Sequence, residues 1–256
     1  KQLNDVDAKV ASIALSVLDE ACDEVECLDS LIAAKPQIVR TMSDLGKCLW
    51  LRFLSRPAGF KWLSEINWIE EEMKSWKRKL NVVYVINLET ALAEVFSPSL
   101  YKQRETEQSG DGVYLPPHFY GELAKTREGC DLLEKSKHIP KFISYIQDPK
   151  TDQLKKRAAL WALGHIGSSS TGFKFLEKYS VLPLILGIAE NSPCFSLRGT
   201  SCYILGMMSR VDRARELLNV AGWESPNNPS SCIAVPKDST RNSFFKVPEY
   251  KFEGSF

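Results

Sequence analysis

The sequence of 256 residues is short of net charge and of histidine, and both shortages narrow its function. It has 33 Lys and Arg residues against 32 Asp and Glu, a formal net charge of +1, and only three histidines. Domains that bind duplex nucleic acid usually carry a basic excess, so we expect no nucleic-acid partner. No apolar run approaches the ~18 residues that a membrane-spanning helix needs.

Motifs for catalysis or metal binding are also lacking. His165 falls in the most apolar helical stretch, where a satisfied core histidine is more common than a catalytic base. His118 and His138 have no Cys or Asp at the spacing of a nucleophile and its base. Cys22 and Cys27 lie five residues apart, on different faces of a helix, and no histidine pair accompanies them. Phosphate-binding glycine motifs do not occur. We therefore expect no enzymatic activity, no cofactor and no metal.

Seven cysteines, an odd number, lie mostly in apolar helical stretches. This usage favours reduced, buried thiols in a cytoplasmic protein over a disulfide framework.

One pattern of residues recurs along the chain at an interval of 43. The glycines at 121 and 129, Leu133 and Pro140 are each followed 43 residues later by the same residue type, and a third copy follows after 42. A fainter copy lies upstream, where residues 59–63 repeat much of residues 172–176. A period of about 40 to 47 residues is typical of armadillo and HEAT repeats. The sequence therefore predicts an all-α, armadillo/HEAT-like helical repeat solenoid with an irregular, extended C-terminal tail.

The repeat also predicts how the chain is divided. We expect N-terminal helical repeats over residues 1–96, a polar loop and aromatic connector over 97–119, armadillo-like repeats over 120–223 and an extended tail over 224–256. The loop is placed by the interval from Gly59 to Gly129, which is 70 residues instead of 43. The tail is rich in Ser, Pro and Asn. Near the N-terminus, Val6, Val10, Ile13, Val17 and Leu18 share one helix face.

Basic side chains recur where successive inner helices begin. Lys155, Lys156 and Arg157 open one such helix, and Arg198 follows Lys156 by 42 residues. In a solenoid these positions can line one surface, which would make a positive groove for an acidic peptide or a phosphate. Solvated helix starts are the more common outcome of such charge runs.

Aromatic residues gather in a second candidate region, residues 113–120. Four rings lie close to a Pro-Pro pair there, which suits a docking edge, although such a stretch can equally cap the open end of a repeat stack. The candidate partner-binding residues, with two more from the tail, are Tyr114, Leu115, Pro116, Pro117, Phe119, Phe244 and Phe245.

Three stretches of the repeat resemble hallmarks of the rictor family, the rapamycin-insensitive companion subunit of target of rapamycin complex 2. They are residues 154–169, which contain LWALGHIGSS, and residues 120–130 and 197–206. The resemblance is good over residues 114–223, loose before them and slight in the tail. It indicates the C-terminal region of a family member, similar to those of fungi.

The resemblance implies a non-catalytic scaffold of a kinase complex. Its partners would be the target of rapamycin kinase and the other subunits of complex 2, and it would reach the plasma membrane only as part of that complex. In fungal members the C-terminal region is held to cover the rapamycin-binding domain of the kinase. The nucleotide and zinc sites known elsewhere in the family match no residue pattern here. The alternative function is a regulatory receptor that binds a phosphate-bearing ligand or an acidic peptide through its basic repeat surface.

Overall fold

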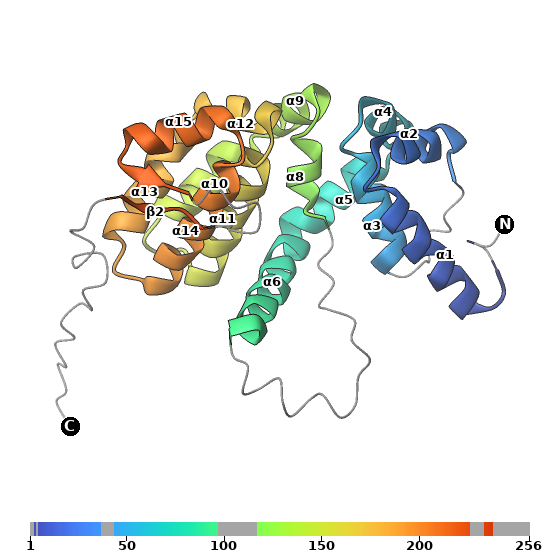
Figure 1. Cartoon of the computed structure of the whole chain (residues 1–256), viewed down its shortest axis with the longest axis horizontal. Helices are drawn as coiled ribbons and strands as arrows, with labels where there is room; N and C mark the ends of the chain where they lie inside the picture. The colour runs from blue at the N-terminus through green and yellow to red at the C-terminus, as the bar shows by residue number, and fades with distance from the viewer. Residues whose placement is uncertain (1–2, 4, 37–43, 97–116, 226–232, 238–256) are drawn as a thin grey trace.

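The computed structural model describes residues 3, 5–36, 44–96, 117–225 and 233–237. Within these ranges the chain is almost entirely α-helical, and its strands are the two-residue β1 (Trp223–Glu224) and β2 (Val235–Pro236), which pair antiparallel. The predicted all-α repeat fold is confirmed. Along the long axis of the molecule, α1 to α4 occupy one end, α6 and α8 the middle, and α11 to α15 the other end (Figure 1).

The N-terminal part consists of helices that end in one long continuous stretch. Its elements are α1 (Ala8–Ala21), α2 (Val25–Ala34), α3 (Asp44–Phe53), α4 (Pro57–Glu65), α5 (Trp68–Ser75), the π-helix η2 (Trp76–Leu80) and α6 (Asn81–Phe96). From Trp68 to Phe96 the chain stays helical through α5, η2 and α6. A π-helical turn is rare and often lies at a functional site, so η2 is a candidate position for such a site.

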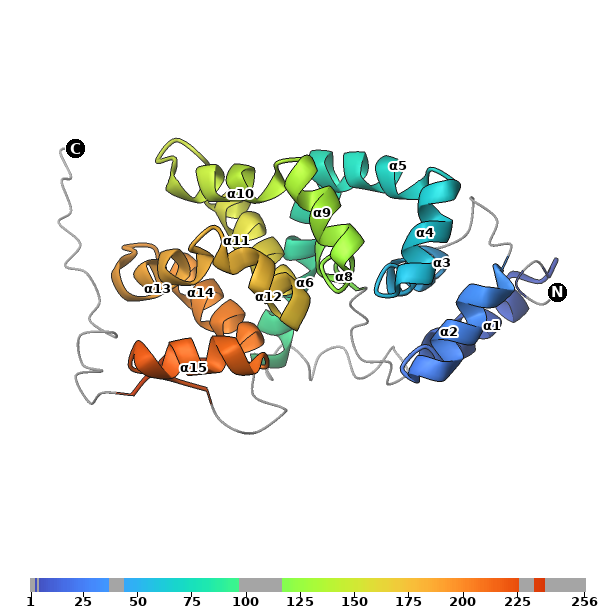
Figure 2. The same ribbon diagram turned by 90° about the horizontal axis from the view of Figure 1, so that it is seen from above.

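The second part repeats a pattern of helices. Its elements are α8 (Phe119–Leu123), α9 (Arg127–Lys135), α10 (His138–Gln147), α11 (Gln153–Gly167), α12 (Ser170–Glu177), α13 (Val181–Asn191), α14 (Phe195–Met208) and α15 (Asp212–Val220). The triplet α8, α9 and α10 is followed by α11, α12 and α13, and then by α14 and α15. Seen from above, the triplets follow one another along the molecule (Figure 2).

A left-handed backbone residue precedes the third element of each copy. Asn67, Lys137 and Ser180 have φ values of 57°, 53° and 51°, and Gly222 has φ 78°. These positions are separated by 70, 43 and 42 residues, the intervals that separate the repeated sequence letters. The repeat is therefore defined by backbone geometry as well as by residue type, although three of the four side chains are not glycine.

Glycines of the repeat lie inside helices and permit the close approach of neighbouring helices. A Cβ on Gly129 would lie 1.9 Å from the carbonyl oxygen of Leu123, and one on Gly172 would lie 2.0 Å from that of Ile166. Each glycine is the third residue of a middle helix and packs against the end of the helix before it. Only a residue without a side chain fits there.

The core runs through α11, which is buried on nearly every side, as the sequence predicted. Leu160, Ala162, Leu163 and Ile166 are all fully buried. Neighbouring helices α8, α10, α12 and α14 pack around it. A helix that is apolar all round belongs in an interior, and α11 is the central element of this one.

Part of the predicted tail is held against the last repeat. Ala234 is fully buried and its backbone N–H donates to the carbonyl of Cys202 at 3.1 Å, while Lys237 N–H donates to Gly222 at 2.8 Å. The remaining tail, 226–232 and 238–256, and the loop 97–116 lie outside the described residues. The domain boundaries therefore stay a prediction.

Candidate binding site

The aromatic docking edge falls only partly within the described residues. Tyr114, Leu115, Pro116, Phe244 and Phe245 lie outside them.

Pro117 is half-buried, and Phe119 is fully buried. The Phe119 ring stacks on Trp76 with centroids 5.7 Å apart. Phe119 is therefore a core residue, contrary to the prediction that it contacts a partner, because it joins α8 to η2.

The four predicted cations do not form one open surface. Arg198 is buried in α14, and its Nε donates to the carbonyl of Ala189 at 3.0 Å. Arg157 forms an ion pair with Glu89 at 2.9 Å. These two guanidinium groups serve contacts between helices, so the predicted anion site over all four residues is wrong for Arg157 and Arg198.

Of the other two predicted cations, Lys156 is half-buried and does not line a cavity described here. Lys155 lines a cavity that the sequence did not reveal. This cavity of about 290 Å³, here called the junction cavity, is lined by side chains of η2, α6, α8, α10 and α11. Four cations line it: Lys77 and Arg78 from η2, Lys141 from α10 and Lys155 from α11. Among the described residues, none of the four has an ion-pair partner. The carboxylate at the cavity is that of Asp152, whose Oδ1 accepts the backbone N–H of Lys155 at the start of α11.

Beside the cavity lies a buried cluster of rings that joins the two parts of the chain. Asn81, at the start of α6, donates from Nδ2 to the carbonyl of Ala158 in α11 at 3.0 Å. Its Oδ1 therefore accepts, and His118 donates to it from Nε2 at 3.1 Å. His118 stacks on His165, with ring centroids 4.3 Å apart and planes 5° from parallel. Tyr84 completes the cluster through its hydroxyl, 3.3 Å from His165 Nε2.

Burial keeps the three histidines neutral near pH 7. It lowers the pKa of His165 to about 3, with a smaller contribution from the charge of Lys125. The pKa of His118 lies well below its usual value, through burial first and then through His165. The pKa of His138 falls to about 4 through burial, and then through the charges of Lys77 and Lys141. Two of these histidines stack as neutral rings, so their role in the cluster is structural.

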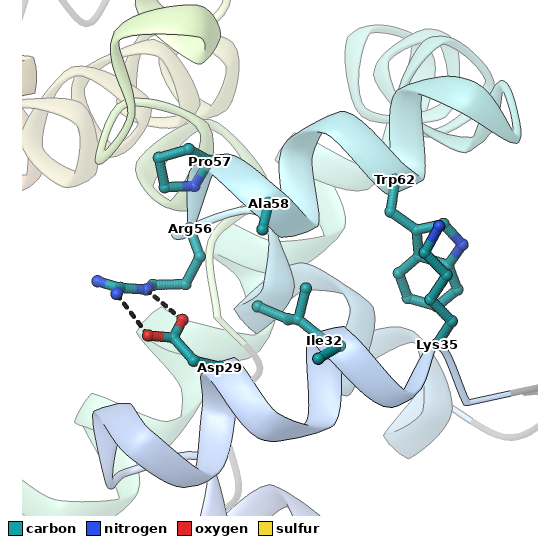
Figure 3. Close-up of a pocket in the computed structure, with 8 residues that line it drawn as sticks. Asp29, Ile32, Lys35, Arg56, Pro57, Ala58 and Trp62 are labelled. Carbon is teal, nitrogen blue, oxygen red and sulfur yellow. Dashed lines mark hydrogen bonds and ion pairs between the residues drawn. The ribbon is translucent and has the colours of Figure 1, made fainter.

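A second cavity, of about 420 Å³, lies between α2 and α4 (Figure 3). Arg56, the N-cap residue of α4, binds both carboxylate oxygens of Asp29 in α2, at 2.7 and 2.6 Å. Hydrogen bonding from Arg56 lowers the pKa of Asp29. Lys35 pairs with Glu65 at 3.9 Å. All the charges at this cavity are thus paired, which distinguishes it from the junction cavity.

The described residues offer neither a site for a metal ion nor a helix that could cross a membrane. No three His, Cys, Asp or Glu side chains in these ranges are grouped so that they could hold a metal ion. None of the helices described is long and apolar enough to span a bilayer.

The fold and the cavity together define an armadillo-type helical repeat protein with a positively charged hollow where its two parts meet. Two family models match the chain: "Rapamycin-insensitive companion of mTOR RasGEF_N domain" over residues 1–98 and "Rapamycin-insensitive companion of mTOR, domain 5" over residues 154–224. The chain belongs to the rictor family.

Similarity to curated relatives extends over nearly the whole chain. This chain is 47% identical to Protein pianissimo A of Dictyostelium discoideum, over 100% of this chain and 22% of that protein. Identity is 35% to the human Rapamycin-insensitive companion of mTOR, over 93% of this chain and 15% of that protein. It is also 35% to the target of rapamycin complex 2 subunit ste20 of Schizosaccharomyces pombe, over 98% and 21%. The chain thus spans about a fifth or less of the length of these relatives.

Proposed function

We propose that this chain is part of a non-catalytic scaffold subunit of target of rapamycin complex 2 and helps to assemble the kinase complex in the cytoplasm. Membership of the rictor family supports this role, as does the name of the fission yeast relative as a subunit of that complex. Helical repeats present extended surfaces that bind other proteins. Recruitment to the plasma membrane would then come through the complex and not through this chain.

The observation that carries the proposal is an exposed apolar stripe on α1. Val10, Ile13 and Val17 are 37%, 66% and 59% exposed, and they follow one another at helical spacing. The opposite side of α1 faces α3, where Asp19 pairs with Arg52 at 2.7 Å. An amphipathic helix normally turns its apolar stripe toward the core, whereas here much of the predicted apolar face points outward. Exposed apolar patches of this kind mark interaction sites.

A variant of this stripe tests the scaffold role. In the full-length subunit, the pair Ile13→Asp and Val17→Asp should reduce co-purification of the kinase, because each places a charge where an apolar surface is buried on assembly. The matched control is Val220→Asp, an exposed apolar residue of α15 at the other end of the molecule. Undiminished co-purification of the double variant, or equal loss in the control, would argue against the proposal.

The same assembly would mask the rapamycin-binding surface of the kinase. The predicted contact elements, Tyr114 to Pro117 and the tail aromatics, are the residues we propose for this role. Removing residues 238–256 from the full-length subunit should then let the drug-bound immunophilin capture the assembled kinase. If the complex stays intact and is still not captured, masking by this tail is excluded while the scaffold role stands.

A further inference from the structure

We propose that the junction cavity binds a phosphate monoester group, held by Lys77, Arg78, Lys141 and Lys155. This goes beyond the scaffold role and does not depend on it. It also moves the predicted anion site: of the four cations expected from the sequence, only Lys155 takes part.

The first argument is the balance of charge around the cavity. Four cations converge on it from η2, α10 and α11, and within the described part of the chain none of them is neutralised by a carboxylate. The one lining carboxylate, Asp152, caps α11 through its Oδ1. At other helix contacts, Arg52, Arg56 and Arg157 each have an acidic partner. A cluster with an excess of three positive charges is suited to a dianion.

The second argument is the position of two ammonium groups over one ring. Lys155 Nζ lies 4.2 Å and Lys141 Nζ lies 5.5 Å from the centroid of Tyr145. Attraction to the face of the ring holds each cation in place. The two like charges are thus gathered at the cavity by an uncharged group, which leaves their hydrogen-bond donors available to a ligand.

The third argument is a pair of buried polar side chains that line the same cavity. His138 is 4% exposed, and neither of its ring nitrogens has a hydrogen-bond partner in the described structure. Tyr120 is fully buried, and its hydroxyl is also unpartnered. Buried polar atoms in native proteins nearly always have partners, and each exception requires an explanation. A bound oxyanion would supply acceptors for the Tyr120 hydroxyl and for an N–H of His138.

Size and local structure favour a phosphate over a longer acidic segment. A volume of about 290 Å³ is at the lower end for ligand pockets, enough for a phosphate and a small carrier. A phosphate monoester presents three acceptor oxygens, and the guanidinium of Arg78 can bind two of them at once. The π-helical turn places Trp76, Lys77 and Arg78 at the cavity in succession.

Calorimetric titration of the whole chain tests the proposal with three probes. These are inorganic phosphate, a phosphoserine peptide and the same peptide with glutamate in place of phosphoserine. Saturable binding of phosphate is expected. A phosphopeptide that binds more tightly than free phosphate identifies a phosphorylated protein as the source of the group, and equal affinities identify a small phosphate-bearing molecule. A glutamate peptide that binds as well as the phosphopeptide would overturn the assignment to phosphate.

Variants of the cations provide the decisive comparison. The pair Lys77→Ala and Arg78→Ala should weaken phosphate binding by roughly tenfold or more, since charge-assisted hydrogen bonds are strong. The matched control is Lys74→Ala with Lys79→Ala, two exposed cations of the same helical stretch that do not line the cavity. Tyr145→Leu, which releases both lysines, should also weaken binding. No saturable binding by the parent chain, or equal weakening in the control pair, would overturn the proposal. Unchanged melting temperatures of the variants would separate lost binding from lost folding.

Discussion

The imidazole of His118 lies flat against that of His165, with centroids 4.3 Å apart and planes 5° from parallel. His118 comes from the connector before α8, and His165 from the central helix α11. Asn81, at the start of α6, ties this pair to the N-terminal part through His118. The stack therefore lies where the N-terminal helices join the repeats.

Neutral buried histidines make the stability of this fold depend on pH. His118, His138 and His165 all have a lowered pKa in the folded state. As the pH falls through about 6.5, the unfolded chain takes up protons that the folded chain does not. Stability is therefore fully present above pH 6.5 and declines below it, by up to about 1.4 kcal/mol per pH unit for each histidine.

Urea unfolding between pH 7.5 and 5 measures this decline. Burial raises the pKa of Glu72 and of Glu122 in the folded state, so their proton uptake offsets part of the loss near pH 5. His138→Phe should reduce the slope of stability against pH by about one histidine's share. A free energy of unfolding that does not change from pH 6.5 to 5 would refute the claim that these histidines stay neutral in the folded state.

Asn81 should be far more sensitive to substitution than other helical asparagines. Asn81→Leu removes the bonds to Ala158 and His118. The carbonyl of Ala158 keeps its bond within helix α11, whereas the buried Nε2–H of His118 is left unpaired, at a cost of about 1–3 kcal/mol. Asn191, whose Nδ2 bonds the carbonyl of Gly187 on an exposed surface, provides the control. Asn191→Leu should change the unfolding free energy by less than about 0.5 kcal/mol. Similar effects at the two sites in urea unfolding would refute the role given to Asn81.

Substitution by alanine should change the stability of the fold in opposite directions at two kinds of glycine. Gly129→Ala and Gly172→Ala would place a Cβ within 2.0 Å of a backbone oxygen, so we expect losses of roughly 3 kcal/mol or more. Gly187 and Gly199 also lie in helices, but nothing lies within 4 Å of a Cβ built on them. Alanine there should stabilise the fold by up to about 1 kcal/mol. Equal effects at both kinds of position would contradict the close packing of the repeat.

The left-handed residues offer a stabilising change. Lys137 and Ser180 adopt a conformation that costs a side-chain-bearing residue about 1–2 kcal/mol. Replacement by glycine should raise the melting temperature by a few degrees, because the relieved backbone strain exceeds the entropic cost of introducing a glycine. Lys135→Gly, at the end of helix α9, should lower it. A lower melting temperature for both Lys137→Gly and Ser180→Gly would show that this geometry is not a strained feature of the repeat.

The repeat could be predicted from the sequence because helix packing requires the same residue types at equivalent positions of each copy. Gly129 and Gly172 recur because no side chain fits beside the preceding helix, and the apolar residues of α11 recur because that helix is enclosed. The left-handed position could not be recognised in the sequence, because Asn67, Lys137 and Ser180 share a backbone angle but no residue type. Residues with short polar side chains tolerate that angle, and lysine gives no signal for it.

The binding site was less predictable for a different physical reason. Lys77 and Arg78 are distant in sequence from Lys141 and Lys155, and only the turn at η2 and the packing of α10 bring the four together. A run of cations at the start of one helix suggested Arg157, and the 42-residue interval from Lys156 suggested Arg198. Tertiary packing directs those two side chains to Glu89 and to the carbonyl of Ala189. Besides Lys155, the visible signal for this cluster in the sequence was the run of consecutive cations from Lys77 to Lys79.

The outward apolar stripe of α1 allows the most direct test of the scaffold role. A photo-crosslinking amino acid at Ile13 of the full-length subunit, activated in the assembled complex, should form an adduct with another subunit of that complex. The same amino acid at Val220 should form none. An adduct only with the subunit's own chain, or no adduct at Ile13, would contradict the account.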